Sequence, residues 1–277
     1  MAKQSPDPRF SLVPMDEMHL DRAPLEKVLT QIVFSRHPVL NSDEGEERLA
    51  ALLPMYPIRR QIPVMNLNLL QPLQQLNQGA SISRTFEDSA QEWKVTVLDT
   101  SIALETNLYS DRDDFCRRIR EILDAVSQVS SPPVVDRVGL RYIDRISEEA
   151  DLKRLREFVN PQMRVLLGSV EDPLGVEYSM SDTVLRISED ERMKIRSGLF
   201  PPNIGHDPVL PPLPVASWVL DVDVFTVSGG LSFVPQDLEA QVRIFAEHAY
   251  SFFRWATSDT FQTAFQSTAD DPLKLQR

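Results

Sequence analysis

Three arginines recur at every fourth position of the segment RVGLRYIDRI, residues 137–146. If this segment is a β-strand, its alternation places Arg137, Arg141 and Arg145 on one face, over roughly 26 Å. Guanidinium groups pair bidentately with carboxylates and phosphates, so this strip would bind an anion or an acidic segment of a partner. The alternative is structural, with the arginines paired to acidic side chains on neighbouring strands. Because the chain is rich in acids, we favour the structural interpretation.

Two aspartates stand two positions apart in WVLDVDVF, residues 218–225. On a strand, Asp221 and Asp223 share a face and lie about 6.6–7 Å apart. That separation suits the paired carboxylates of a glycoside hydrolase or a divalent-metal site. Pairing with Arg141 or Arg145 explains the aspartates without chemistry, and we expect such an electrostatic network rather than catalysis.

The sequence offers little else for catalysis. His248 follows Glu247 on a predicted helix, where it borders the apolar stripe, and no nucleophile or second acid suggests a triad around it. The motifs GxGxxG, GxxxxGKS/T and GxSxG do not occur, which removes the commonest phosphate cradles and the nucleophile elbow. Cys116 is the only cysteine, so an intrachain disulfide and a thiolate-rich metal site are excluded. We therefore predict no catalytic residue, no metal ligand and no cofactor, and we favour a protein that is not an enzyme.

The 277-residue chain carries 29 lysines and arginines against 41 aspartates and glutamates, a formal net charge of −12. This balance argues against general nucleic-acid binding, because phosphate contacts need clustered positive charge. Hydrophobic residues at 42% and charged residues at 25% are typical of a globular protein with an ordinary core. The sequence has no run of about 18 apolar residues and no secretory signal, so we expect a cytoplasmic protein without a membrane span.

Hydrophobic periodicity gives the order strand, helix, strands, helix twice along the chain. The first half comprises strands at 27–35, 62–70, 82–87, 92–98 and 101–109 and helices at 43–53 and 111–129. The second half comprises strands at 137–146, 176–180, 183–188, 193–199 and 218–227 and helices at 151–159 and 235–265. We predict a flexible tail over residues 1–23, a first half over 24–133 and a second half over 134–277.

We predict an α+β fold in which two similar strand-helix-strands-helix halves form one antiparallel sheet platform covered by two long helices. This element order resembles that of the TATA-box-binding protein, whose halves are related by a pseudo-twofold axis. Two separate α+β domains, or a grip fold with a helix over a sheet, stay open as alternatives.

A proline-rich loop, FPPNIGHDPVLPPLPV, covers residues 200–215 and contains six prolines. This composition favours extended and stiff backbone. As an arm, the loop would reach an aromatic groove or another subunit. As a strap, it would pack on its own sheet through Leu210, Leu213 and Val215, which is the interpretation that we favour.

Four stretches of the chain resemble the landmarks of an uncharacterised, sporadically distributed prokaryotic protein family. They are PLEKVLTQIVF (residues 24–34), RVGLRYIDRI (137–146), WVLDVDVF (218–225) and IFAEHAYSFFRWATSDTFQTAF (244–265). The GLRYI core is the most specific, and Asp144 stands where members typically have asparagine, which gives GLRYID for a GLRYIN-like motif. The family has no assigned activity, so the resemblance implies no catalytic residue. Its patchy distribution implies accessory or defence-type gene modules.

These observations together predict a non-catalytic protein-interaction module. The expected partner is a protein with a basic surface, encoded in a neighbouring gene, and the resemblance implies an accessory or toxin-neutralising role; a homo-oligomer stays open. One alternative is an enzyme that uses Asp221 and Asp223. The other is an anion or nucleic-acid binder that uses Arg137, Arg141 and Arg145, whose affinity would fall steeply with salt.

Overall fold

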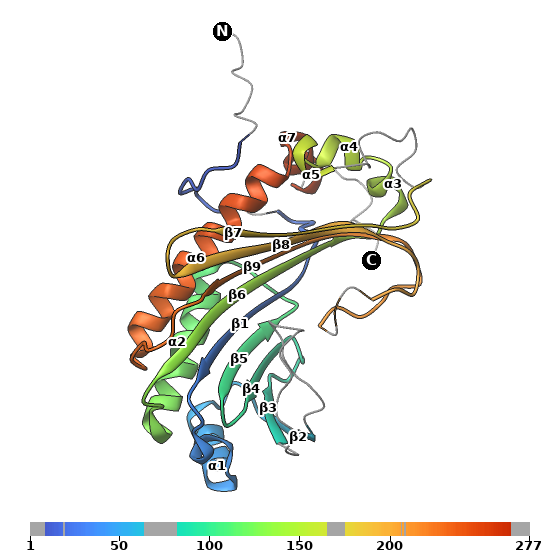
Figure 1. The fold of residues 1–277 in the computed structure, drawn as a ribbon. Coiled ribbons are helices and arrows are strands. Elements are labelled where there is room, and N and C mark those ends of the chain that lie inside the picture. Colours follow the sequence, from blue (N-terminus) through green and yellow to red (C-terminus); the bar gives the residue numbers. More distant parts are fainter. Residues whose placement is uncertain are drawn as a thin grey trace.

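A single antiparallel sheet runs through the protein (Figure 1). A computed structural model describes residues 9–18, 20–63, 82–164, 175–205, 207 and 209–266. Within these residues, nine strands pair in the order β2-β3-β4-β5-β1-β6-β9-β8-β7. They are β1 (Leu25–Phe34), β2 (Ile58–Pro63), β3 (Ile82–Glu87), β4 (Trp93–Val97), β5 (Ser101–Thr106), β6 (Val135–Ile146), β7 (Ser179–Arg186), β8 (Glu191–Phe200) and β9 (Ser217–Thr226). Because β1 and β6 pair at the centre, both halves share one sheet, and the predicted α+β class is confirmed.

Two long helices lie side by side on one side of the sheet (Figure 1). Helix α2 (Arg112–Ser130) contacts α6 (Pro235–Ala256), and α6 contacts β6 and β9. The shorter helices are η1 (Pro38–Asn41), α1 (Asp43–Leu52), α3 (Glu149–Leu152), α4 (Leu155–Phe158), α5 (Pro161–Arg164) and α7 (Asp259–Phe265). In the described part of the chain, no helix is both long and apolar enough to cross a membrane. The main hydrophobic core joins side chains of these two helices to one face of the sheet.

Helix α2 forms as its sequence pattern predicts. The residues of its apolar stripe are all buried: Phe115, Ile119, Ile122, Val126 and Val129. Burial of each such large side chain is worth about 1.5–3 kcal/mol, which is ample to hold the helix on the core. Asp111 stands before the first turn, and its carboxylate accepts a hydrogen bond from the backbone N–H of Asp114. This cap satisfies one of the backbone donors that a helix start leaves free.

The prediction of one long helix over residues 235–265 is wrong. Helix α6 ends at Ala256, and α7 begins at Asp259 after an extended backbone at Thr257 and Ser258. The hydroxyl of Ser258 accepts a hydrogen bond from the backbone N–H of Phe261, so it caps the new helix. The apolar period continues across this break, which is why periodicity alone joins the two helices.

Four other predicted elements differ in extent. The predicted helix over 151–159 is two separate turns, α3 and α4, with a break at Lys153 and Arg154. The strands predicted at 176–180 and 183–188 are the single strand β7. The strand predicted at 62–70 overlaps the structure only at the end of β2, and its remaining residues lie outside the described part.

The chain that precedes β1 packs on α6. We predicted a flexible tail over residues 1–23, and the structure describes residues 9–18 and 20–23 of it, which we call the N-terminal strap. Its contacts with α6 are an edge-to-face pair of Phe10 with Phe252 at 5.1 Å between ring centroids, a hydrogen bond from Val13 N to Ser251 Oγ at 3.2 Å, and one from Met18 N to Tyr250 Oη at 2.7 Å. The strap is therefore held by both aromatic packing and backbone hydrogen bonds.

The proline-rich loop covers the sheet face opposite the long helices. On that face, strand alternation places Leu29, Ile143 and Val219, and they form a second apolar cluster together with Phe200, Val209 and Leu210. The proline-rich loop therefore packs on its own sheet, as we favoured, and of its three predicted anchors Leu210 belongs to this cluster. Leu210 is fully buried, whereas Leu213 is half-buried and Val215 is exposed.

The loop anchor yields a stability prediction. Leu210→Ala should lower the free energy of unfolding by about 2–4 kcal/mol, because it removes a fully buried side chain and leaves a cavity. Leu213→Ala, the matched change at a half-buried position of the same loop, should cost less than about 1 kcal/mol. Urea unfolding measures both values. Equal losses in the two variants would show that the loop is not anchored at Leu210.

Candidate functional site

A buried ion pair joins two of the sequence-predicted residues. Arg141 on β6 donates two hydrogen bonds to Asp221 on β9, from Nε to Oδ1 at 2.7 Å and from Nη2 to Oδ2 at 2.8 Å. Both side chains are almost fully removed from solvent, at 1% and 0% exposure. Arg196 on β8 approaches the same carboxylate at 2.7 Å. Asp221 is thereby compensated by two cations, which matches the structural interpretation of the strip.

The proline-rich loop contributes its own acid to this network. Asp207 Oδ2 accepts a hydrogen bond from Arg141 Nη2 at 3.1 Å. Burial by itself would raise the pKa of Asp207, but the charges of Arg141 and Arg196 and a backbone hydrogen bond from Val209 hold it below its usual value. Farther along the strip, Arg145 Nη2 donates to the backbone oxygen of Pro211 at 2.8 Å. The arginines thus hold the loop as well as the strands.

The remaining sequence-predicted residues lie at the end of the same network. Arg137 Nη2 lies 3.5 Å from Asp223 Oδ2, and the Arg137 guanidinium stands 4.5 Å from the centre of the Phe225 ring. Burial raises the pKa of Asp223 to about 6, although Arg137 and Arg141 oppose the shift. Because the three guanidinium groups of the strip are largely buried, this conformation presents no open anion site there.

His248 lies half-buried on α6, and its Nδ1 has no hydrogen-bond partner among the described residues. Over that same part of the chain, no three histidine, cysteine, aspartate or glutamate side chains gather closely enough to hold a metal ion. These observations supply no general base or metal centre.

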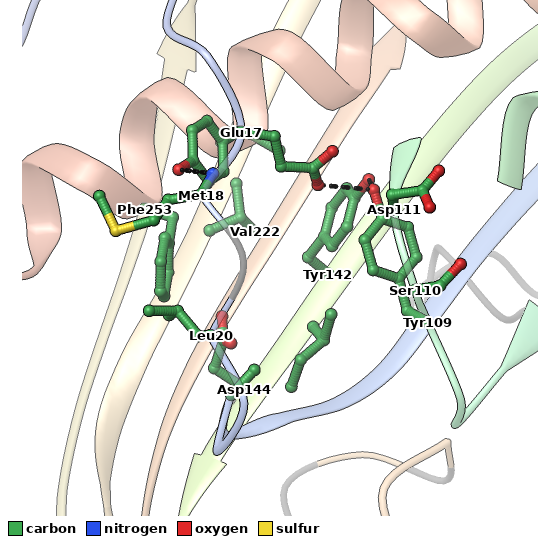
Figure 2. A pocket seen from close by; sticks show the side chains of 14 residues that line it. Glu17, Met18, Leu20, Tyr109, Ser110, Asp111, Tyr142, Asp144, Val222 and Phe253 are labelled. Atoms are coloured by element: carbon green, nitrogen blue, oxygen red, sulfur yellow. Dashed lines mark hydrogen bonds between the residues drawn. The ribbon is translucent and has the colours of Figure 1, made fainter. Parts of the chain in front are cut away.

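A cavity of about 420 Å³ lies on the helix side of the sheet. Its walls come from the N-terminal strap and the first residue of β1, from the connection between β5 and α2, from β6 and β9, and from α6 (Figure 2). The polar and aromatic lining residues that matter for its chemistry are Glu17, Tyr109, Asp111, Tyr142, Asp144 and Tyr250. This volume is in the range of sites that bind small molecules.

A chain of hydrogen bonds crosses one wall of the cavity. Tyr142 Oη donates to Tyr109 Oη at 3.2 Å, and Tyr109 Oη donates to Glu17 Oε1 at 2.9 Å (Figure 2). The other carboxylate oxygen of Glu17 accepts from the backbone N–H of Arg112 at 3.0 Å, at the first turn of α2. Burial raises the pKa of both tyrosines, so their hydroxyls stay protonated. The hydroxyls of both tyrosines and the carboxylate of Glu17 therefore already have hydrogen-bond partners within the protein.

Asp144 is the unusual group of the cavity. Its side chain points into the cavity from β6 (Figure 2), and the residue is only 5% exposed. No hydrogen bond or ion pair holds its carboxylate among the described residues, and none of the described lining residues is a lysine, arginine or histidine. Burial, together with the negative charge of Asp221, raises the pKa of Asp144 to about 7.

The sequence contains a signal for Asp144 but none for the cavity. Asp144 alternates with Val138, Leu140, Tyr142 and Ile146, so a carboxylate stands on the apolar face of a central strand. Such a placement marks a buried acid, which is costly unless something compensates it. The other walls come from segments far apart in the sequence, and no local pattern connects them.

Comparisons with known proteins leave the site to be judged from its geometry. No model of a known protein family matches the chain, and no curated protein matches it either. The resemblance based on GLRYID, residues 139–144, therefore stays a prediction. Asp144, which stands where members of that family typically have asparagine, is one of the acids that line the cavity.

The buried network predicts coupling between its members. Arg141→Ala and Asp221→Asn should each lower the free energy of unfolding by about 3–5 kcal/mol, because each leaves buried charge poorly compensated. The double variant should lose at least about 1 kcal/mol less than the sum of the two. Denaturant unfolding of the four proteins measures this interaction energy. The exposed pair of Arg120 and Asp124 is the control, and its single variants should change stability by less than about 0.5 kcal/mol. Additive losses at Arg141 and Asp221 would contradict the network.

The raised pKa of Asp144 predicts a pH-dependent stability. The folded protein keeps a proton on Asp144 up to about pH 7, whereas the usual pKa is 3.8, so stability falls as pH rises between these values. Asp144→Asn mimics the protonated acid and should be more stable than the wild type by about 2–4 kcal/mol at pH 8. This gain should shrink below pH 7 and nearly vanish at pH 4.

Urea unfolding across this pH range measures the effect, with Asp182→Asn on the exposed strand β7 as a control. Asp182 is exposed and pairs with Lys194 at 3.2 Å, so the control should change stability by less than about 1 kcal/mol at every pH. A gain for Asp144→Asn that does not depend on pH would show that Asp144 titrates normally in the folded state.

Proposed function

We propose that this chain is a non-catalytic module that binds a protein partner by strand addition at β7. Strand β7 has eight residues and stands at the end of the sheet, where it pairs with β8 alone among the described strands. The outer edge of such a strand offers backbone N–H and C=O groups to an extended segment of another chain.

The side chains of β7 support this proposal and are the observation that carries it. Met180 and Val184 of β7 are 46% and 55% exposed, and Tyr178, just before the strand, is 53% exposed. By strand alternation all three lie on one face, together with Asp182 and Arg186. Edge strands that must stay unpaired are usually protected by charge or proline, and large exposed apolar side chains invite a partner.

The opposite edge of the sheet makes the contrast clear. Strand β2 carries Arg59 and Arg60, which pair with Glu47 and Glu87, and it ends at Pro63. These are the features by which natural sheets discourage strand addition. The two edges thus differ in their protection, and β7 is the better candidate for binding.

The charge of the chain favours a basic partner over a second copy. Two copies, each with a formal net charge of −12, repel one another, whereas a basic segment is attracted. Binding of this kind is also what an accessory or toxin-neutralising component would require. The buried ion pairs of Arg141 and Asp221 weigh against the enzyme and nucleic-acid alternatives, because they engage the residues that those functions need.

We also propose that the two halves are related by a pseudo-twofold axis, as in the TATA-box-binding protein. The sheet order supports this relation. From the centre outward, the first half runs β1, β5, β4 and the second runs β6, β9, β8, so each half places its first strand beside its last. In each half, one of the two long helices follows the last strand.

Strand addition at β7 can be tested with two separate variants, one that places a lysine on β7 and one that places a lysine on the opposite edge strand, β2. Val184→Lys should reduce recovery of a stoichiometric protein partner at least about tenfold when the tagged chain is purified from its native cells. Ile62→Lys makes the same kind of change at an exposed position of β2 and should leave recovery unchanged. Mass spectrometry identifies and counts the partner.

Three results would overturn this proposal. The first is equal recovery of the partner by both variants. The second is recovery of nucleic acid without protein. The third is self-association of the purified chain that Val184→Lys abolishes in light scattering, because the second copy would then be the partner.

A further inference from the structure

Among the described lining residues of the cavity, apolar walls surround one carboxylate, that of Asp144, which has neither a hydrogen-bond donor nor a cation beside it. Much of the cavity's lining is hydrocarbon: Leu20, Leu25, Val222, Ala249 and Phe253. Its volume of about 420 Å³ exceeds the space of isolated waters and suits a small organic molecule. Burial of apolar surface against these walls would supply binding energy for the body of such a ligand.

The other acids of the cavity already have donors. Glu17 accepts from the hydroxyl of Tyr109 and from the backbone of Arg112, and Asp111 accepts from the backbone of Asp114 as the cap of α2. Asp144 differs, because the described residues offer its carboxylate neither a donor nor a cation. A buried carboxylate without a partner is costly, and a cation that enters the cavity would remove that cost.

We propose that this cavity binds a small ligand with an apolar body and a protonated amine, and that the ammonium group pairs with Asp144. The rings of Tyr109, Tyr142, Tyr250 and Phe253 surround the same space. Aromatic faces attract ammonium groups, so they favour a cation over a neutral ligand of equal size. The N-terminal strap supplies the outer wall through Met18 and Leu20.

Ligand binding should be coupled to loss of a proton. The groups that face Asp144 across the cavity are the acids Glu17 and Asp111 and the tyrosines Tyr109, Tyr142 and Tyr250, while Asp221 lies on the opposite face of the sheet. None of these described groups carries a positive charge, so in this proposal the ligand's ammonium supplies the cation that ionises Asp144. Affinity for the amine should therefore rise about tenfold per pH unit toward pH 7 and then level off.

Simple amines and their neutral counterparts test this site. We would titrate the full chain at pH 8 with phenethylamine and n-octylamine, and with 2-phenylethanol and n-octanol, and follow the ligands by NMR. The amines should bind at least about tenfold more tightly than the alcohols. Asp144→Asn should abolish this preference, and it should remain folded because it removes a buried charge. Glu17→Gln, which changes an acid that already has donors, should keep the preference for amines over alcohols, and Asp182→Asn, at an exposed acid outside the cavity, should leave amine affinity unchanged within about twofold.

Several results would overturn the proposal. These are absence of amine binding to the wild type, equal affinity for amine and alcohol, and unchanged amine affinity in Asp144→Asn. Loss of binding in Glu17→Gln alone would assign the cation to a different acid and would also overturn it. None of these outcomes bears on strand addition at β7, which lies at the edge of the sheet.

Discussion

The buried ion pair of Arg141 and Asp221 is the constraint on which the second half of the sheet depends. Removing a guanidinium and a carboxylate from water carries a penalty of several kcal/mol per ion, which only close pairing can offset. Arg141 on β6 and Asp221 on β9 meet this condition with two hydrogen bonds, and Arg196 on β8 adds a second cation. A slip of one residue between these strands would turn a charge toward the hydrophobic core, so the pair fixes the register of three strands.

Strand β6 connects this network to the cavity, because one of its faces carries Arg141 and the other carries Asp144. One face holds Arg141, whose charge is fully engaged by acids of β9 and of the proline-rich loop. The other face holds Asp144, whose carboxylate has no partner among the residues that the structure describes and whose pKa is raised by burial and by the charge of Asp221. The acid that stabilises one face thus makes ionisation harder on the other. A ligand that ionises Asp144 must offset the repulsion from Asp221 as well as the cost of a buried charge.

Sequence reasoning succeeded where the information was local. The stripe of α2 follows from spacing, and so do the strand faces that carry the arginines and the aspartates, because side-chain direction on a helix or strand depends on position alone. Spacing left open whether Arg141 or Arg145 pairs with the aspartates, and the pairing of β6 with β9 decides for Arg141 and Asp221. Sequence reasoning failed at Ser258, where a helix cap interrupts an apolar period that continues on both sides. It also missed the cavity, whose walls come from five separate segments. Asp144 was visible as an acid on an apolar face, but its lack of a partner is a property of the packed molecule.

The N-terminal strap has a consequence for how the molecule is made. Met18 and Tyr250, which join the strap to α6, are 232 positions apart in the chain. The ribosome synthesises the N-terminal strap before all nine strands and α6 after them, so the strap can contact α6 only after the whole sheet has been synthesised. Contacts of such long range are slow to form, because the intervening chain must first be ordered. The outer wall of the cavity is therefore among the last features to assemble, and a cavity that can retain a ligand marks a chain whose folding has finished.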